Sequence, residues 1–490
     1  MRQRSDAVFW SGLEAASAAA LSFASAFLIA RLVGPAELGV GAAVVAPQVL
    51  LCVAVNALFA DAIAQRPALD IEAASSAFWA SAAVGCVAAL ALAALGWPVA
   101  RALADPRVPA MAALLALPLP LVGAGGAAQG VLTCQRRYRD LAGRTIIGQG
   151  LGTTLGIVLA LSGAGAWAVV AQQTATSLVG AVALLVRAGW RPRLSFRFSA
   201  VRQLVAIGLP LVASTLVQHG RYRLFALAIG DVAGAATLGQ VHLAFRLVDT
   251  VRDLTATALW RLMLPTFAAR QHRQDELCGA IDRCLSLSAL ALFPLWGAIA
   301  LMTGPLVAWL LGPVWTQAVG AALPLIVLAC WTSLCFPGGV AAVARGATGY
   351  TLAAHIAATL LTLGATVLLR PATPLGAAAI WIAAQLALAP YILLRTARAL
   401  RVPPFRPMRA GLRAAGLAAI ATAAAALLAA LPGAPSGAFP QIILRLAVLG
   451  AVYLTGVAWL LRDDLAEALR EVGVTSRVRA DRAGRQIAES

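Results

Sequence analysis

Long apolar segments recur along the whole chain, and they constrain its fold more than any other feature. Charged residues make up only 12% of the 490 residues, about half the share in soluble domains. The sequence divides into about fourteen apolar segments, each near the ~20 residues that a helix needs to cross a bilayer core. We therefore expect an all-α polytopic membrane protein. The expected spans are 8–30, 39–60, 75–97, 110–133, 145–163, 166–187, 203–230, 235–258, 281–303, 316–343, 351–369, 375–394, 410–431 and 441–462.

The fourth expected span contains two prolines, Pro118 and Pro120. Proline removes a backbone hydrogen bond, and membrane helices tolerate it where neighbours or water satisfy the freed carbonyl groups. We therefore expect this span to be kinked or broken.

The first residues, Met1 to Asp6, lead directly into a full-length apolar span. This arrangement indicates a retained first helix rather than a cleaved signal peptide.

The arginines indicate how the chain is oriented. The net charge is +18, but the positive residues punctuate the apolar segments and form no soluble basic domain, so no nucleic-acid partner is expected. Alternate connections hold sixteen arginines: Arg136, Arg137, Arg139, Arg144, Arg187, Arg191, Arg193, Arg197, Arg202, Arg270, Arg273, Arg395, Arg398, Arg401, Arg406 and Arg409. The opposite loops hold only Arg31, Arg101, Arg107 and Arg370. Because arginine-rich loops stay in the cytoplasm, both termini are predicted to be cytoplasmic.

Signals of enzymatic or metal chemistry are weak in this sequence. The seven cysteines form no CxxC pair, so neither a metal site nor a disulfide framework is indicated. All the positive residues are arginine, and without lysine no GxxxxGK[ST] phosphate loop can exist. The short external loops offer only Glu37, Asp105 and Asp231 as acids. We expect no catalytic residues, no metal and no cofactor. Any transport must be secondary or facilitated, unless a partner supplies the energy.

Charged side chains interrupt the apolar pattern between His219 and Asp253. On the second of the two helices there, four polar residues recur at i, i+4, i+7 and i+11, which places them on one face; they are His242, Arg246, Asp249 and Asp253. A charge at mid-bilayer costs roughly 3 kcal/mol, so this face must meet protein or a wet cavity. Arg246 with Asp249 and Arg252 with Asp253 could simply pair and tie helices together. We favour a hydrated, basic central cavity.

Four arginines in this stretch are candidate substrate-binding residues, since guanidinium groups bind phosphate or carboxylate oxygens bidentately. They are Arg221, Arg223, Arg246 and Arg252. For Arg221 and Arg223 an alternative stays open. Arg223 is roughly 10 Å from the helix end at 1.5 Å per residue, so both side chains could instead extend to the external interface.

Other polar residues are candidates for ion coupling or for lining the cavity. They are Glu14, Asp249, Asp253, His219 and His242. Glu14 could couple transport to protons or could make a helix–helix hydrogen bond. The histidines could titrate near neutral pH or could be buried and satisfied. Gln172 and Gln173 could bind sugars or could bridge helices.

A weak internal repeat divides the chain into halves. LIARLVGPAELGVGAAVVA resembles LFALAIGDVAGAATLGQVHLAF, with Leu38-Gly39 matching Leu238-Gly239. Repeat-built transporters bind substrate near the midplane between repeats. The first copy has Ala46 and Val49 where the second has Arg246 and Asp249, which predicts an electrostatically lopsided cavity. The expected parts are an N-lobe (1–187), a basic linker (188–202), a C-lobe (203–394), a basic loop (395–409), a terminal helix pair (410–462) and a cytoplasmic tail (463–490).

The motifs LIARLVGPAELG, LFADAIAQRPALD and SSAFW resemble a known family. They are similar to the polysaccharide transporter branch of Wzx-type oligosaccharide flippases, in the multidrug/oligosaccharidyl-lipid/polysaccharide (MOP) exporter superfamily. The resemblance extends from about Val8 to Arg462. Its most specific element is F-x-D-A-I-x-Q-R, here Phe59, Asp61, Ala62, Ile63, Gln65 and Arg66. The chain departs from the family near Phe225, where an acidic residue is expected and none is present.

The resemblance implies two six-helix bundles that alternate between inward-open and outward-open states. The implied function is the flipping of undecaprenyl-diphosphate-linked oligosaccharide units across the bacterial inner membrane, for exopolysaccharide, capsule or lipopolysaccharide synthesis. The implied partners are this lipid-linked oligosaccharide, membrane lipids, and a polysaccharide polymerase with its export machinery. Asp61, Gln65 and Arg66 would lie at the cytoplasmic mouth, where a structural Asp61–Arg66 salt bridge is favoured over transport chemistry.

Two other functions stay open. The same fold could carry a different cargo, such as a drug or a peptidoglycan precursor. A membrane glycosyltransferase or polymerase is less favoured, because the external loops are short and carry few acids.

Overall fold

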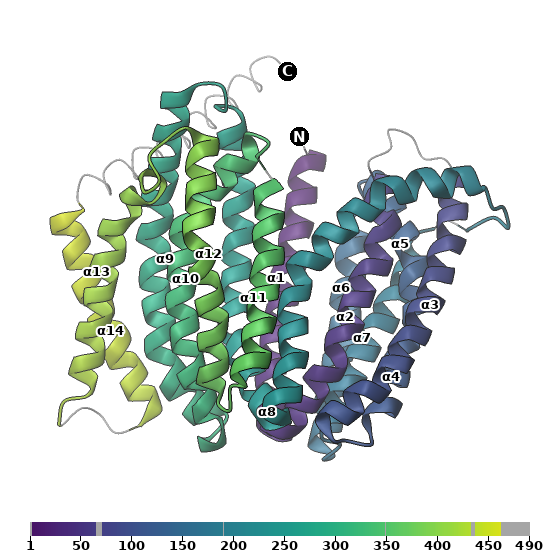
Figure 1. Cartoon of the computed structure of the whole chain (residues 1–490), viewed down its shortest axis with the longest axis horizontal. Coiled ribbons are helices and arrows are strands. Elements are labelled where there is room, and N and C mark those ends of the chain that lie inside the picture. The colour runs from purple at the N-terminus through teal and green to yellow at the C-terminus, as the bar shows by residue number, and fades with distance from the viewer. Residues whose placement is uncertain (1, 65–70, 190, 348, 433–436, 462–490) are drawn as a thin grey trace. The chain divides into compact units, whose positions relative to one another are not determined.

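The computed structural model describes residues 2–64, 71–189, 191–347, 349–432 and 437–461, and all regular elements in these ranges are helical (Figure 1). The helices are α1 (Arg2–Val33), α2 (Pro35–Ala64), α3 (Ile71–Leu103), α4 (Val108–Ala116), α5 (Leu119–Cys134), α6 (Tyr138–Leu161), α7 (Ala166–Arg187), α8 (Phe198–Ala268), α9 (Gln274–Leu310), the 3-10 turn η1 (Pro313–Trp315), α10 (Thr316–Ala344), α11 (Gly349–Leu369), α12 (Pro374–Leu400), α13 (Arg406–Ala429) and α14 (Ala438–Leu460). The predicted all-α membrane fold is confirmed.

Thirteen segments in the described ranges are long and apolar enough to cross a membrane. They correspond to the second through fourteenth expected spans. The first expected span lies in α1, whose apolar part is the shorter Ala20–Val33. The span with two prolines is interrupted as predicted, because α4 ends at Ala116 and α5 begins with Pro118 as its N-cap.

Two glycines make matching turns in the two copies of the sequence repeat. Gly34 separates α1 from α2 with a φ of 82°, and Gly234 interrupts α8 with a φ of 81°. This left-handed region is open to glycine at little cost, whereas a side chain would be strained there. The long helix α8 therefore has two legs, residues 198–233 and 235–268, which agrees with the predicted boundary between the seventh and eighth spans.

The two copies of the repeat also pack directly against each other just after these turns. A Cβ atom on Gly39 would overlap the carbonyl oxygen of Ala235, and a Cβ on Gly239 would overlap the carbonyl oxygen of Pro35. The amide nitrogen of each glycine is among the nearest neighbours of the other. The contact is thus reciprocal, and only glycine allows the two backbones to come so close.

The helices form two compact units. The first comprises Met1–Thr250, Leu310–Ala321 and Leu352–Gln385. Within it, apolar side chains of α2, α3, α4 and α7 make one buried cluster around Val44, Leu92 and Leu115. The segment 310–321 is held to the rest by hydrogen bonds from Arg31 to the Leu310 carbonyl oxygen (2.8 Å) and from Gln240 to the Val314 carbonyl oxygen (2.6 Å).

Arg107 takes part in a hydrogen-bond network that joins three segments of the first unit. It donates hydrogen bonds to Asp105 (2.7 Å) and to Glu37 (2.8 Å), and Glu37 also accepts a bond from the amide of Ala166 (2.7 Å). These contacts join the start of α2 to the α3–α4 loop and to the start of α7. The hydrogen bonds from Arg107 lower the pKa of Asp105, because they stabilise its charged form.

The second unit comprises Val251–Trp309, Ala322–Thr351 and Leu386–Ser490. Its core lies among α9, α10, α13 and α14, with Leu285, Phe293 and Ala421 buried at its centre. Figure 1 shows α13 and α14 as a neighbouring pair. Tyr453 ties α14 to α9 by donating to the Leu290 carbonyl oxygen (3.0 Å), and Arg445 donates to the Leu301 carbonyl oxygen (2.9 Å).

Each unit uses one arginine in the same way. Arg137, just before α6, donates to the carbonyl oxygens of Arg187 (2.9 Å) and Ala188 (3.2 Å) at the C-terminal end of α7. Arg345, just after α10, donates to the carbonyl oxygen of Ala399 (3.2 Å) near the end of α12. A cation at this position satisfies free carbonyl groups and complements the helix dipole.

Several expectations about organisation stay predictions. The lobe boundaries, the cytoplasmic linker and the orientation of the termini are inferred from the sequence alone. The tail 463–490, together with Gln65 and Arg66 of the family motif, lies outside the described residues. Asp61 is placed in α2, but its side chain is not among those described.

Candidate functional site

A pocket of about 140 Å³ lies between α1, α2, α7 and the two legs of α8, all in the first unit. It is lined by Ser25, Ala26, Ile29, Leu38, Ala42, Val45, Val49, Val169, Gln172, Gln173, Arg223, His242, Leu243 and Arg246. Three of the predicted site residues, Arg223, His242 and Arg246, are therefore brought together.

The wall formed by α8 is cationic. His242 and Arg246 are one turn apart on the second leg, and Arg223 reaches the pocket from the first leg. Arg246 donates a hydrogen bond to the hydroxyl group of Ser22 on α1. His242 Nδ1 lies 2.9 Å from the hydroxyl oxygen of Tyr222, so this histidine is hydrogen-bonded within the protein. All three side chains are half-buried.

The wall formed by α2 is apolar, with Leu38, Ala42, Val45 and Val49 facing the pocket. In the sequence repeat, Ala42 corresponds to His242. The pocket thus lies between the two copies of the repeat, one neutral and one charged. This is the lopsided arrangement that the sequence comparison predicts.

The third wall is polar and comes from α7. Gln172 donates to the hydroxyl of Ser25 on α1 (3.1 Å), and Gln173 donates to the side-chain oxygen of Gln48 on α2 (3.2 Å). Both glutamines therefore make the interhelical hydrogen bonds that the sequence left as one alternative. Their position in the pocket wall leaves them close to any bound ligand.

Arg221 has a different environment from Arg223. It is 5% exposed, and its guanidinium carbon lies 3.9 Å from the ring centroid of Trp381 on α12. Its Nη2 donates to Thr362 on α11 (3.2 Å). Tyr222, Phe225 and Phe245 pack around the same tryptophan. The aromatic cluster thus encloses this arginine inside the protein.

The remaining charged residues of the stretch lie further along α8. Asp249 is half-buried, one turn after Arg246. Arg252 and Asp253 make the ion pair that the sequence left as an alternative, with Nη2 3.1 Å from Oδ1, and their side chains are 42% and 70% exposed. Of the other candidates, His219 is placed in the first leg of α8 without a described side chain.

Glu14 takes part in a helix–helix contact. Its Oε1 accepts a hydrogen bond from the hydroxyl of Thr145 on α6 (2.6 Å). This is the interhelical bond that the sequence left as an alternative to proton coupling. A role in coupling stays a prediction.

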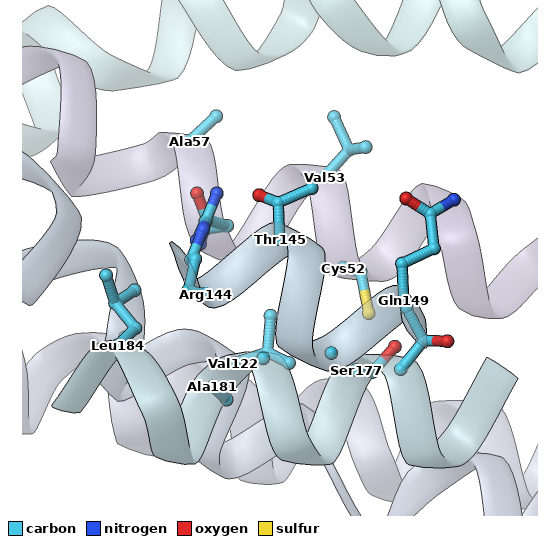
Figure 2. A pocket seen from close by; sticks show the side chains of 15 residues that line it. Cys52, Val53, Ala57, Val122, Arg144, Thr145, Gln149, Ser177, Ala181 and Leu184 are labelled. Atoms are coloured by element: carbon cyan, nitrogen blue, oxygen red, sulfur yellow. The ribbon is translucent and has the colours of Figure 1, made fainter. Parts of the chain in front are cut away.

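A second and larger cavity, of about 420 Å³, lies among α2, α5, α6 and α7 (Figure 2). Its polar lining residues are Cys52, Asn56, Arg144, Thr145, Gln149, Thr176 and Ser177. This cavity is not predicted from the sequence, where Arg144 is expected in a loop before a span at 145–163. The helix begins earlier, at Tyr138, so Arg144 lies within it. The spacing of Arg144, Thr145 and Gln149 is a signal that could have revealed this polar face.

The described residues contain no group of three or more His, Cys, Asp or Glu side chains able to hold a metal ion.

A polytopic helical protein with a cationic pocket between two repeats defines a membrane transporter. A family model described as "Polysaccharide biosynthesis protein" matches residues 28–320, more than half of the chain. The chain therefore belongs to this polysaccharide biosynthesis family.

A similar protein of known role is the succinoglycan biosynthesis transport protein ExoT of Rhizobium meliloti (strain 1021). The two are 24% identical over 311 residues, which cover 64% of this chain and 63% of the relative. The match thus spans slightly less than two thirds of that protein's length.

The fold is shared with solved structures of flippases and transporters. The lipid II flippase MurJ, in an inward closed conformation, superimposes with a TM-score of 0.73 over 93% of this chain and 99% of its own, at 11% identity. An inward-facing multidrug resistance MATE family transporter of the MOP superfamily gives a TM-score of 0.57 over 82% of this chain and 94% of its own, at 17% identity. The predicted membership of a polysaccharide family is thus confirmed, and the fold is the one that these solved transporter structures have.

Proposed function

We propose that this protein is a flippase for undecaprenyl-diphosphate-linked oligosaccharide units in bacterial polysaccharide synthesis. The observation that carries the proposal is the cationic wall of the smaller pocket, where Arg223, His242 and Arg246 meet between the two repeats. Family membership and the transporter fold support it, and we assign the protein to transport rather than to catalysis.

The chemistry of the cargo explains why such a wall is needed. A diphosphate carrying sugars is anionic and strongly hydrated, so its passage through hydrocarbon is prohibitively costly without help. Guanidinium groups offer paired N–H donors that match phosphate oxygens. Arg246 and Arg223 would supply this charge inside a site that the rest of the protein shields from lipid.

The proposed mechanism is alternating access, with the termini in the cytoplasm of a bacterium and the protein in its inner membrane. The arginine-rich connections support this orientation by the positive-inside rule. In this mechanism the pocket would open to one side of the membrane at a time, driven by an ion gradient or the membrane potential.

A peptidoglycan precursor is the second candidate cargo, because the fold is shared with a lipid II flippase. Both cargoes carry a lipid-linked diphosphate, so the cationic wall suits either. Disrupting the gene in its own host separates them. Loss of a surface polysaccharide with normal growth supports the oligosaccharide cargo, whereas arrest of cell-wall synthesis supports the precursor.

The test of the cationic wall uses Arg246→Ala and Arg246→Lys in the disrupted strain. We expect Arg246→Ala to abolish polysaccharide output and to accumulate the lipid-linked intermediate, with the protein still present in the membrane. Arg246→Lys should restore part of the output, since a point charge replaces the two-pronged guanidinium.

Arg273→Ala is the matched control, because Arg273 is exposed and pairs only with its helix neighbour Glu276 (2.7 Å) among the described residues. It should transport normally. Full output from Arg246→Ala at normal abundance would contradict the proposal.

A further inference from the structure

We propose that the larger cavity of about 420 Å³ is a second binding site of the flippase, one that takes an acidic sugar of the cargo. The inference rests on the proposed function and names a substrate class for it. The ligand we assign is a sugar ring that bears a carboxylate.

The cavity is separate from the pocket with Arg223 and Arg246, and the two share no lining residue. Figure 2 shows Arg144, Thr145 and Gln149 along one helix, α6, and Val53 and Ala57 on the neighbouring helix α2. Because positions 144, 145 and 149 of a helix lie on neighbouring parts of one face, α6 presents them together.

Arg144 is the residue that points to a ligand. Its side chain is half-buried, yet it makes no hydrogen bond or ion pair with any residue that the structure describes. Glu14 is close enough to interact with it electrostatically but does not pair with it. Instead, Glu14 accepts its hydrogen bond from Thr145. A cation in a membrane protein interior is costly unless it is paired, so this site favours an incoming anion.

Two amide side chains in the lining are also without partners in the described part of the chain. Asn56 on α2 and Gln149 on α6 make no hydrogen bond there, although each can donate two and accept two. Ser177, in contrast, is already bonded to Gln48 (3.2 Å). Within the described residues, the cavity therefore combines an arginine that makes no hydrogen bond with amide groups of α2 and α6 that make none either.

This combination suits an acidic sugar better than a bare phosphate. A guanidinium group binds a carboxylate through two parallel hydrogen bonds, and amides bind ring hydroxyls. The volume also falls within the range of small-molecule sites, about 300–1,000 Å³. A single phosphate would leave most of this space and both amides unused.

Cys52 provides a reporter, since its side chain lines the cavity. The experiment uses the full-length purified protein with the other six cysteines replaced by serine. The rate at which a small methanethiosulfonate reagent modifies Cys52 is measured with D-glucuronate, with D-glucose and with pyrophosphate. We expect D-glucuronate to slow the modification, while the neutral sugar and pyrophosphate do so far less.

The variant Arg144→Gln should weaken the effect of glucuronate at least about tenfold in concentration, and Arg144→Lys should retain part of it. Arg273→Gln, which removes an exposed arginine, should behave as the parent does. The inference is overturned if glucose protects as well as glucuronate, or if protection survives Arg144→Gln. Stronger protection by pyrophosphate would assign the cavity to the diphosphate instead.

A second measurement needs no cysteine reaction. The unfolding midpoint of the parent protein is recorded with the same three compounds, and only glucuronate should raise it, by an amount that Arg144→Gln removes. Both readouts concern binding alone. Failure of the flippase proposal would show in cells as unchanged polysaccharide output, whereas failure of this inference would show only in the binding data.

Discussion

Arg221 and Arg223 are two residues apart on the same leg of α8, yet they meet opposite surroundings. Arg221 is enclosed by Trp381 and Thr362. Arg223 lines the pocket with His242 and Arg246. Positions two apart point to nearly opposite sides of a helix, so one face can pack inside the protein while the other lines the pocket. A charge in a membrane helix is therefore no sign of transport chemistry until its surroundings are known.

The largest effect, on the stability of the protein, is expected from replacing the enclosed residue Arg221. Arg221→Ala removes a desolvated cation–aromatic contact, worth about 2 kcal/mol or more, and a charged hydrogen bond of similar size. We expect the free energy of unfolding to fall by about 2–4 kcal/mol, with a large loss of folded protein. Thermal unfolding in detergent, followed by size-exclusion chromatography, measures this. A fully stable variant that fails only in transport would place Arg221 with the cargo instead.

The second-largest effect is expected for the double variant Arg246→Leu/Asp249→Leu, which changes the pocket wall. If Arg246 and Asp249 acted as a pair, removing one would typically cost about 3–5 kcal/mol, whereas replacing both with apolar residues is often neutral. We expect normal abundance with no polysaccharide output, because the cation for the cargo is gone. Normal abundance together with full output would make these two residues scaffold.

A smaller effect is expected for Arg223→Gln. This residue is one of two arginines in the pocket, and its guanidinium carbon is 5.6 Å from the ring centroid of Tyr222. Polysaccharide output should fall about tenfold, which corresponds to one weakened charged contact. The unfolding midpoint should stay close to that of the parent. A stability loss as large as that of Arg221→Ala would erase the difference between the two sides.

The smallest effect should follow from Arg252→Ala. Arg252 pairs with the adjacent and more exposed Asp253, and exposed pairs contribute about 0–1 kcal/mol. We expect output to fall less than in Arg223→Gln, with little change in stability. Output abolished to the level of Arg246→Ala would extend the cargo site along the whole stripe.

The helices could be predicted from the sequence because crossing a bilayer depends on the length and composition of one segment at a time. The same holds for the broken fourth span, since Pro118 acts on its own turn. The cationic wall could also be predicted, because the spacing of His242 and Arg246 alone places them on one face of a helix. Each of these features is local.

The rest depends on partners that lie far away in the sequence. Arg221 and Arg223 could not be told apart, because helix rotation is set by packing against neighbours, and Trp381 is on α12. The cavity around Arg144 was missed for a similar reason. The cavity is formed by four helices together, so no single segment of the sequence indicates it. In the sequence, Arg144 fits the positive-inside pattern equally well as a loop residue.

The contact between Gly39 and Gly239 has the geometry of an isologous dimer interface, in which the same patch meets itself across a two-fold axis. Here both halves belong to one chain, so each copy carries its own sequence. In a true homodimer, an arginine placed one or two turns beyond the glycine would face its own duplicate, and like charges would repel. Because the two repeats are joined in one chain and differ in sequence, this repulsion between identical residues does not arise. The single chain lets the backbone stay symmetric at the glycines while one copy lines the pocket with Ala42 and the other with His242 and the charged Arg246.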